Sequence, residues 1–241
     1  MALAVHLYRR IMRRGRVIAL LALSSVPGLL FWLVGFDDTD GNPTELYTDI
    51  LSSVGYTYAI AALILTTATL RDERDSGTLP YIYMRPMARL TMASQSLLAG
   101  VAAALVIGVG GWLAGLLASL AVGDVSIAVP SLALFVAAGV GYAAIFVPLG
   151  YLVPRSLLVG LGYILVVETI LGNVVSGLAQ VSIWRIALSI YAGFEDGFGQ
   201  VATESLGPVT AGIGGGVIKL AIVVLIGLSV LTWALRKRDA L

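Results

Sequence analysis

The sequence contains no cysteine and a single histidine, His6, in 241 residues. Without cysteine there is neither a disulfide framework nor a cysteine-ligated metal site. One histidine leaves almost nothing for a histidine metal site or a Ser-His-Asp triad. Charge is scarce as well, because Asp, Glu, Lys and Arg together make up 12% of the residues. We therefore expect a protein without catalytic chemistry of its own.

Apolar sequence is abundant. Hydrophobic residues make up 59% of the chain, and the mean hydropathy is +0.95. Such a composition leaves too little polar surface for a water-soluble globule, so the main solvent is lipid. A membrane span needs about 20 apolar helical residues. Six runs reach this length: 17–36, 50–70, 93–122, 130–153, 156–178 and 214–235. The sequence predicts an all-α membrane protein with six transmembrane helices.

The basic residues predict the orientation, since short cytoplasmic loops carry an excess of Lys and Arg. Thirteen of the 15 basic residues lie before the first run, between the second and third, between the fourth and fifth, or after the sixth. The exceptions are Arg185 and Lys219. The acidic stretch 37–49 contains no Lys or Arg and is expected outside. We predict a multi-pass protein of the cell membrane with both termini in the cytoplasm.

The N-terminal residues 1–16 contain both apolar and basic side chains. Leu3, Leu7 and Ile11 fall at helical spacing, while arginines cluster on the other side. We expect an amphipathic helix on the cytoplasmic interface, with its apolar face in lipid and its arginines toward anionic headgroups. One alternative is a basic tail that only sets topology. A cleaved signal peptide is disfavoured, because the first run exceeds the usual apolar region of about 7 to 15 residues.

The cytoplasmic segment 71–90 is the most informative part of the chain. Its seven charged residues keep it out of hydrocarbon, yet its centre, 79–84, is apolar and aromatic. A solvated loop has no need of such a centre, which favours a docking surface. Gly77 supplies a sharp turn, Thr78 is suited to cap a short helix, and Pro86 ends it. The apolar residues offered to a partner are Leu79, Tyr81, Ile82 and Tyr83.

This segment contains glutamate, then glycine-threonine-leucine, a few apolar residues, arginine-proline and arginine. The pattern resembles the coupling region of type 2 ABC (ATP-binding cassette) exporter permeases. A lysine that members often carry at the start of the third span is absent from 91–96. The resemblance implies that the residues coupling the chain to an ATPase are Glu73, Gly77, Thr78, Leu79, Tyr81, Ile82, Arg85, Pro86 and Arg89.

The resemblance also implies the partners. It predicts a separate ABC ATPase subunit in two copies, which binds ATP and Mg, and a second permease that is identical or homologous. Membrane lipids are the other expected contact, and no nucleic acid is expected. Transport would be export by alternating access, with the cargo undefined. The chain has no nucleotide site of its own, because its stretch 212–219, GIGGGVIK, has neither glycine before Lys219 nor Ser or Thr after it.

A self-sufficient ion-coupled carrier or a non-transporting membrane scaffold is the alternative function. Ion-coupled carriers tend to show internal repeats and several intramembrane ionisable residues. This sequence places only Glu168 well inside a predicted span, with Lys219 near the edge of another. The ABC permease is therefore the favoured prediction.

Glu168 lies midway along the fifth run, where a carboxylate facing lipid is unfavourable. It is a candidate for the substrate path, or a structural residue that is protonated or paired with Lys219. The other path candidates are Tyr56, Tyr58, Tyr163 and Asn173. The resemblance places the second and fifth helices around the central cavity. Tyrosines near span ends are also typical interfacial anchors.

Residues 179–213 mix aromatic and acidic side chains and are broken by glycines, so a full crossing is not expected. In the resembled family such a segment forms two short external helices that re-enter the outer leaflet. An interfacial loop with aromatic anchors is the alternative. We expect residues 1–241 to form a single transmembrane permease domain.

Overall fold

The computed structural model of the chain describes residues 2–35, 42–78, 87–123, 125–171, 182–194 and 212–237. Within these ranges the regular structure is entirely helical, which confirms the all-α prediction. The described helices are α1 (Ala2–Ile11), α2 (Arg14–Ser24), α3 (Val26–Gly35), α4 (Pro43–Val54), α5 (Tyr56–Asp75), α7 (Arg89–Val122), α8 (Ala128–Leu152), α9 (Ser156–Tyr163), η1 (Ile164–Leu171), α12 (Ile183–Ala192) and α14 (Ile213–Lys237).

Four helical stretches are long and apolar enough to cross a membrane, and a bent pair makes up to five. The four are Arg14–Gly35, which joins α2 and α3, and the single helices α7, α8 and α14. The pair is α4 with α5, bent by 47° at Gly55. The predicted fifth run appears as α9 and the π-helical η1, and its remainder, 172–178, lies outside the described residues. The six-span topology stays a prediction.

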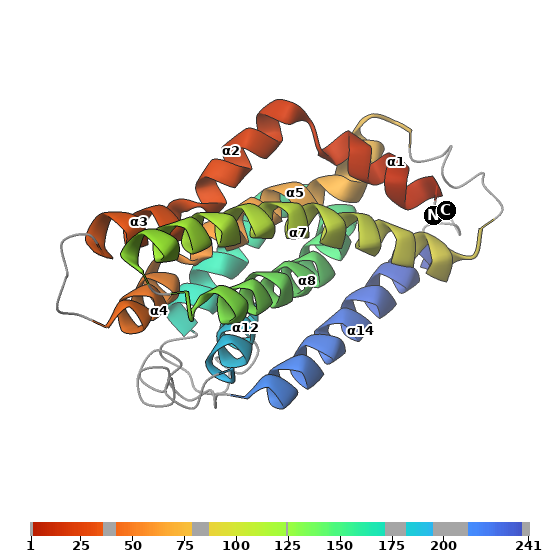
Figure 1. Cartoon of the computed structure of the whole chain (residues 1–241). Coiled ribbons are helices and arrows are strands. Elements are labelled where there is room, and N and C mark those ends of the chain that lie inside the picture. The colour runs from red at the N-terminus through yellow and green to blue at the C-terminus, as the bar shows by residue number, and fades with distance from the viewer. Residues whose placement is uncertain are drawn as a thin grey trace.

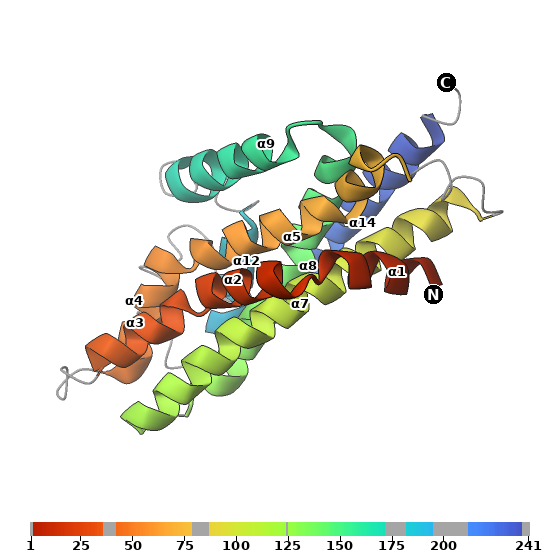
Figure 2. The ribbon, with the colours of Figure 1, turned by 90° about the horizontal axis from the view of Figure 1, so that it is seen from above.

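The centre of the bundle is formed by α5 and α8. Helix α8 packs against α5, α7, α9, α12 and α14, so most of the described fold is assembled around it. Figure 2 shows α5 running between α9 on one side and α2 on the other. Small residues let these helices approach closely, which is how helices associate in lipid. At the α5–α8 crossing, Gly150 lies so near the Thr67 carbonyl that a side chain there would overlap it.

The start of α1 and the end of α14 lie at the same end of the molecule (Figure 1). Helix α5 also ends at this end, and α7 begins there. The opposite end carries α3, α4 and the beginning of α14. The last turn of α5 and the first turn of α7 therefore lie on the same side as the start of α1 and the end of α14, which fits the arrangement that the basic residues predict.

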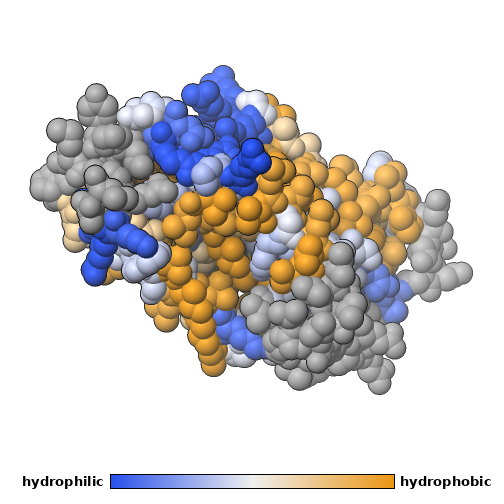
Figure 3. All heavy atoms as spheres, turned by 180° about the vertical axis from the view of Figure 1, so that it is seen from behind, coloured by the Kyte–Doolittle hydropathy of each residue, from blue (hydrophilic) through white to orange (hydrophobic). Residues whose placement is uncertain are grey.

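The flanks of the bundle are apolar. Figure 3 shows hydrophobic residues over a broad area of one face. Leu225, Ile226 and Trp233 on α14 are each more than half exposed, as are Leu98 and Leu117 on α7. Exposed apolar surface of this extent is typical of helices that contact lipid or another membrane protein.

Helix α1 corrects one expectation from the sequence. The predicted apolar stripe is real, but Leu3, Leu7 and Ile11 are buried against the protein and not in lipid. Helix α1 packs on α7 and α5, whose ends offer apolar surface for Leu3 and Leu7 at Leu70 and Met92. The helix spans Ala2–Ile11, and α2 starts at Arg14, so it is shorter than the predicted 1–16.

Candidate coupling site

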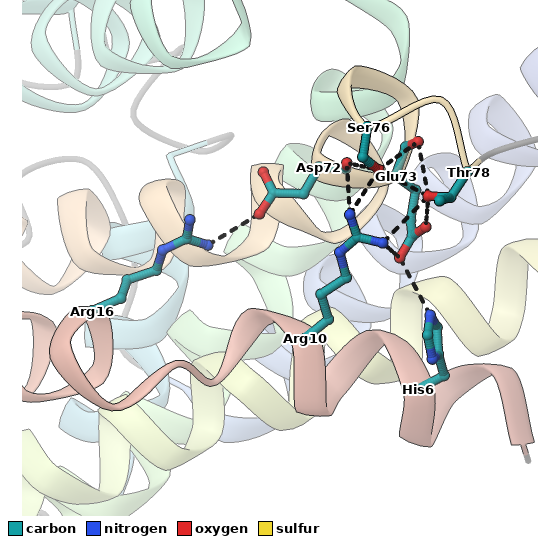
Figure 4. Close-up of polar contacts among 7 residues, drawn as sticks. All are labelled: His6, Arg10, Arg16, Asp72, Glu73, Ser76 and Thr78. Carbon is teal, nitrogen blue, oxygen red and sulfur yellow. Dashed lines mark hydrogen bonds and ion pairs between the residues drawn. The ribbon is translucent and has the colours of Figure 1, made fainter.

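The last turn of α5 holds a buried carboxylate. The side chain of Glu73 is only 1% exposed, although the turn lies at the end of the bundle. An unpaired carboxylate in such a place costs several kcal/mol, so its partners decide whether it is tolerated. Nη1 of Arg10 lies 2.7 Å from Oε1 of Glu73, and Nε2 of His6 lies 3.4 Å from the same oxygen. Both partners come from α1 (Figure 4).

Arg10 also contacts backbone and side-chain oxygens on both sides of Glu73 in the sequence. Its Nη2 donates to the Ser76 hydroxyl at 2.7 Å and to the Asp72 carbonyl at 3.3 Å. Its Nη1 also donates to the Thr78 hydroxyl at 3.3 Å. A guanidinium suits this role because its donors point in fixed directions in one plane. One side chain of α1 therefore reaches four residues at the C-terminal end of α5.

The chain leaves α5 through a tight turn. Gly77 has φ of +71°, in the left-handed region that favours glycine. The Thr78 N–H donates to the Glu73 carbonyl at 3.1 Å, and the Thr78 hydroxyl donates to the Glu73 carboxylate. The sequence-predicted residues Glu73, Gly77 and Thr78 are therefore brought together in one hydrogen-bonded turn. Helix α7 begins at Arg89, which is the far end of the predicted coupling segment.

The remaining predicted coupling residues cannot be placed by this geometry. Leu79, Tyr81, Ile82, Arg85 and Pro86 lie outside the described residues, as does the predicted short helix between Gly77 and Pro86. Their role in docking stays a prediction.

The predicted path residue Tyr58 lies in the core. Its side chain is fully buried, and its hydroxyl donates to the carbonyls of Ala104 on α7 and Phe135 on α8, at 3.0 and 3.3 Å. Its ring packs edge-on against Phe135 at 5.2 Å. In this conformation Tyr58 joins three helices and does not line an open passage.

Tyr56, Tyr163 and Glu168 lie near one another where α9 and η1 contact α5. The Tyr56 hydroxyl donates to the Glu168 backbone carbonyl at 3.3 Å. Tyr163 ends α9, and its ring packs edge-on against Phe146 at 5.9 Å. Glu168 is fully buried in η1. Asn173 lies outside the described residues.

The Glu168 carboxylate faces the first turn of α12. It accepts hydrogen bonds from the Ser182 hydroxyl at 2.6 Å and from the backbone N–H groups of Ile183 and Trp184 at 3.1 and 3.2 Å. Every residue of α12 is buried. This helix is the described part of the predicted external segment 179–213, and residues 179–181 and 195–211 lie outside the described ranges.

Reasoning from the sequence missed Arg10 and Ser182. Arg10 is one of five arginines in the first 16 residues, and nothing in their spacing distinguishes it. Ser182 was detectable, because a serine directly before an apolar run is a typical N-terminal helix cap. It does cap α12 by accepting from the Arg185 N–H at 3.3 Å.

The apolar spans, their exposed apolar flanks and the polar cluster at one end define a multi-pass helical membrane protein. A sequence model of the family described as "ABC-2 family transporter protein" matches residues 12–170, which is more than half of the chain. The chain therefore belongs to the ABC-2 transporter family. Among curated proteins, no relative matches it.

Membership of this family defines the chain as a membrane component of an ABC-2 type transporter and a non-catalytic transmembrane subunit. The family also implies that ATP is used by a partner ATPase. The resemblance found in residues 71–90 is thereby confirmed at the level of the family. The match begins at residue 12, so α1 and Arg10 lie outside the matched range.

Proposed function

We propose that this chain is the permease of an ABC exporter that moves its substrate by alternating access. The energy comes from ATP hydrolysis, with Mg, in a separate ATPase subunit that docks on residues 71–90. Two ATPase copies and a second permease, identical or homologous, complete the transporter. The termini and the docking segment face the cytoplasm, as the basic residues predict.

The observation that carries this proposal is the anchored start of the docking segment. Glu73 is buried, paired with Arg10 and hydrogen-bonded to Thr78, so the chain leaves α5 in a fixed direction. If the start of the segment were not anchored, a force on the segment would only bend the chain at that point. With the start anchored to α1, the force is transmitted to α5, which packs directly against α8 at the centre of the bundle.

A second support is where the segment is connected. It begins within the C-terminal part of α5, a central helix, and ends at the start of α7, which spans 34 residues and packs against α8, α3 and α5. A displacement at the cytoplasmic end of these two helices is thus delivered to most of the described bundle. The export direction rests on the resemblance of the coupling pattern.

Copurification tests the proposal. The tagged chain, extracted from its native membrane in mild detergent, is expected to bring down an ABC ATPase that hydrolyses ATP. Leu79→Asp places a charge on the predicted apolar docking surface and is expected to lower the bound ATPase at least tenfold, which corresponds to about 1.4 kcal/mol. Retention of the ATPase at the wild-type level by Leu79→Asp would contradict the docking assignment.

Val125→Asp is the matched control. It makes the same kind of substitution at a residue that is 54% exposed between α7 and α8, at the opposite end of the molecule from the start of α1 and the end of α14. We expect it to leave the bound ATPase unchanged. An equal loss from Val125→Asp would show that the charge acts through general destabilisation and not through docking.

A further inference from the structure

The docking segment is connected to the bundle by two helices, and α1 touches both of them. Helix α1 packs against α5, where the segment begins, and against α7, where it ends. Leu3 and Leu7 belong to one buried apolar cluster with Leu70 of α5 and Met92 and Ala93 of α7. Helix α1 therefore contacts both of the helices that connect the docking segment to the bundle.

The hydrophobic effect that buries the apolar face of α1 has no preferred direction. The polar contacts of Arg10 do have one, because a hydrogen bond requires its donor and acceptor to be aligned. The Arg10 side chain is 27% exposed, and its guanidinium contacts the Glu73 carboxylate and the oxygens of Asp72, Ser76 and Thr78. These contacts hold α1 at one position relative to the turn that starts the segment (Figure 4).

We propose that Arg10 is a positioning residue for energy coupling: through Glu73 it locks α1 to the start of the docking segment, so that the two move as one body when the ATPase acts. This inference rests on the proposed function. It adds α1, whose residues before 12 lie outside the family match, to the moving parts of the transporter.

The exposed face of α1 provides the place for a reporter. The chain contains no cysteine, so Val5→Cys introduces a single thiol into it. Val5 is 48% exposed on α1, and a fluorophore there need not displace a packed side chain. The complex with its ATPase is placed in nanodiscs of phosphatidylethanolamine and phosphatidylglycerol. Its fluorescence is compared without nucleotide and with ATP plus vanadate, after subtraction of the signal from complexes lacking the introduced thiol.

We expect a nucleotide-dependent change of the Val5 signal with Arg10 present, and a change at least fivefold smaller in Arg10→Gln. The response is expressed per bound ATPase, and the amount of bound ATPase is measured for every variant, so that weaker docking is not counted as a loss of joint movement. Arg10→Lys should restore about half of the response, because an ammonium can pair with Glu73 but cannot reproduce the planar set of donors.

Arg9→Gln is the matched control, because it removes the same charge from the same helix at an exposed position. It should leave the response intact. If Arg10→Gln fails to accumulate because Glu73 is left buried without its cation, the double variant Arg10→Gln with Glu73→Gln removes both charges. The same loss of response is expected from it.

The outcomes separate the two proposals. A full Val5 response in Arg10→Gln or in the double variant overturns the role of Arg10. Absence of any response with Arg10 present, while the ATPase stays bound and active, overturns the joint movement and leaves the proposed function standing. If no ATPase copurifies with the chain, the proposed function fails, and the role of Arg10 fails with it.

Discussion

The hydroxyl of Ser182 lies 2.6 Å from the carboxylate of Glu168, which is fully buried. The two backbone N–H groups that follow Ser182 also donate to this carboxylate, so Glu168 closes the N-terminus of α12 from a different helix. A carboxylate is favoured there, because the free N–H groups of a first turn make a positive pole. An acidic residue inside a predicted span is thereby given a structural role, with α12 tied to η1.

Glu168→Ala is expected to destabilise the protein by about 2 to 3 kcal/mol, because three buried donors lose their acceptor. Reversible unfolding in mixtures of mild detergent and dodecyl sulfate measures this free energy. Ser182→Ala is the matched comparison, since it removes one donor to Glu168 and the cap on the Arg185 N–H but leaves the contacts with Ile183 and Trp184, and it should cost about 1 to 2 kcal/mol. A Glu168→Ala protein as stable as the wild type would show that the carboxylate does not hold α12.

Tyr58 and Tyr142 make a second pair of comparisons. Both side chains are fully buried, but the Tyr58 hydroxyl bonds to two carbonyls, whereas the Tyr142 hydroxyl has no hydrogen-bond partner among the described residues. Tyr58→Phe should lower the free energy of unfolding by about 1 kcal/mol. Tyr142→Phe should leave it unchanged or raise it, because a desolvated hydroxyl is removed. Equal effects of the two substitutions would contradict the hydrogen bonds assigned to Tyr58.

Gly77 tests the turn at the start of the docking segment. A Cβ added there meets no atom within 4 Å, so the effect of Gly77→Ala comes from the positive φ alone. The expected loss is about 1 to 2 kcal/mol, together with weaker ATPase copurification, because the segment leaves α5 in a different direction.

Gly162→Ala provides the reference for Gly77. It also meets no atom within 4 Å, but Gly162 lies in α9 without a positive φ, and alanine favours helix by up to about 1 kcal/mol. Stability should stay level or rise. A loss at Gly162 equal to that at Gly77 would remove the backbone explanation.

Gly55 separates α4 from α5, and the Trp184 indole of α12 occupies the space next to it. A Cβ at position 55 would overlap the Trp184 ring. Gly55→Ala should therefore destabilise the protein by about 1 to 3 kcal/mol, the usual cost of overpacking. The double variant Gly55→Ala with Trp184→Leu should lose clearly less than the sum of the single losses, measured by a double-mutant cycle. Additive losses would show that the two side chains do not compete for this space.

The apolar runs predict much of the fold, because a span must bury its backbone in a helix and must be long enough for the bilayer. Periodicity also identifies Leu3, Leu7 and Ile11 as one face of α1. It does not say whether that face meets lipid or protein, because both are apolar. The bend at Gly55 cannot be predicted from hydropathy either, since a bent and a straight span have the same hydropathy.

The site is less predictable than the fold. Glu73 and Glu168 are recognisable because a carboxylate near or inside a span needs a partner. Their partners are not recognisable, since Arg10 and Ser182 are brought to them by packing between segments distant in sequence. The basic residues near the N-terminus favour a cytoplasmic location in whatever order they occur. Their positions in the sequence therefore do not show which of them pairs with Glu73.

The contact between Gly55 and Trp184 also bears on how this family changes over time. An indole fills space that is free only because position 55 has no side chain, so the ring and a side chain at position 55 cannot both occupy it. A substitution that enlarges one of these two residues then requires a substitution that makes the other one smaller. Among relatives that share the bend, a larger residue at position 55 should accompany a smaller ring or an aliphatic side chain at position 184, and lineages that straighten the helix should have lost both together.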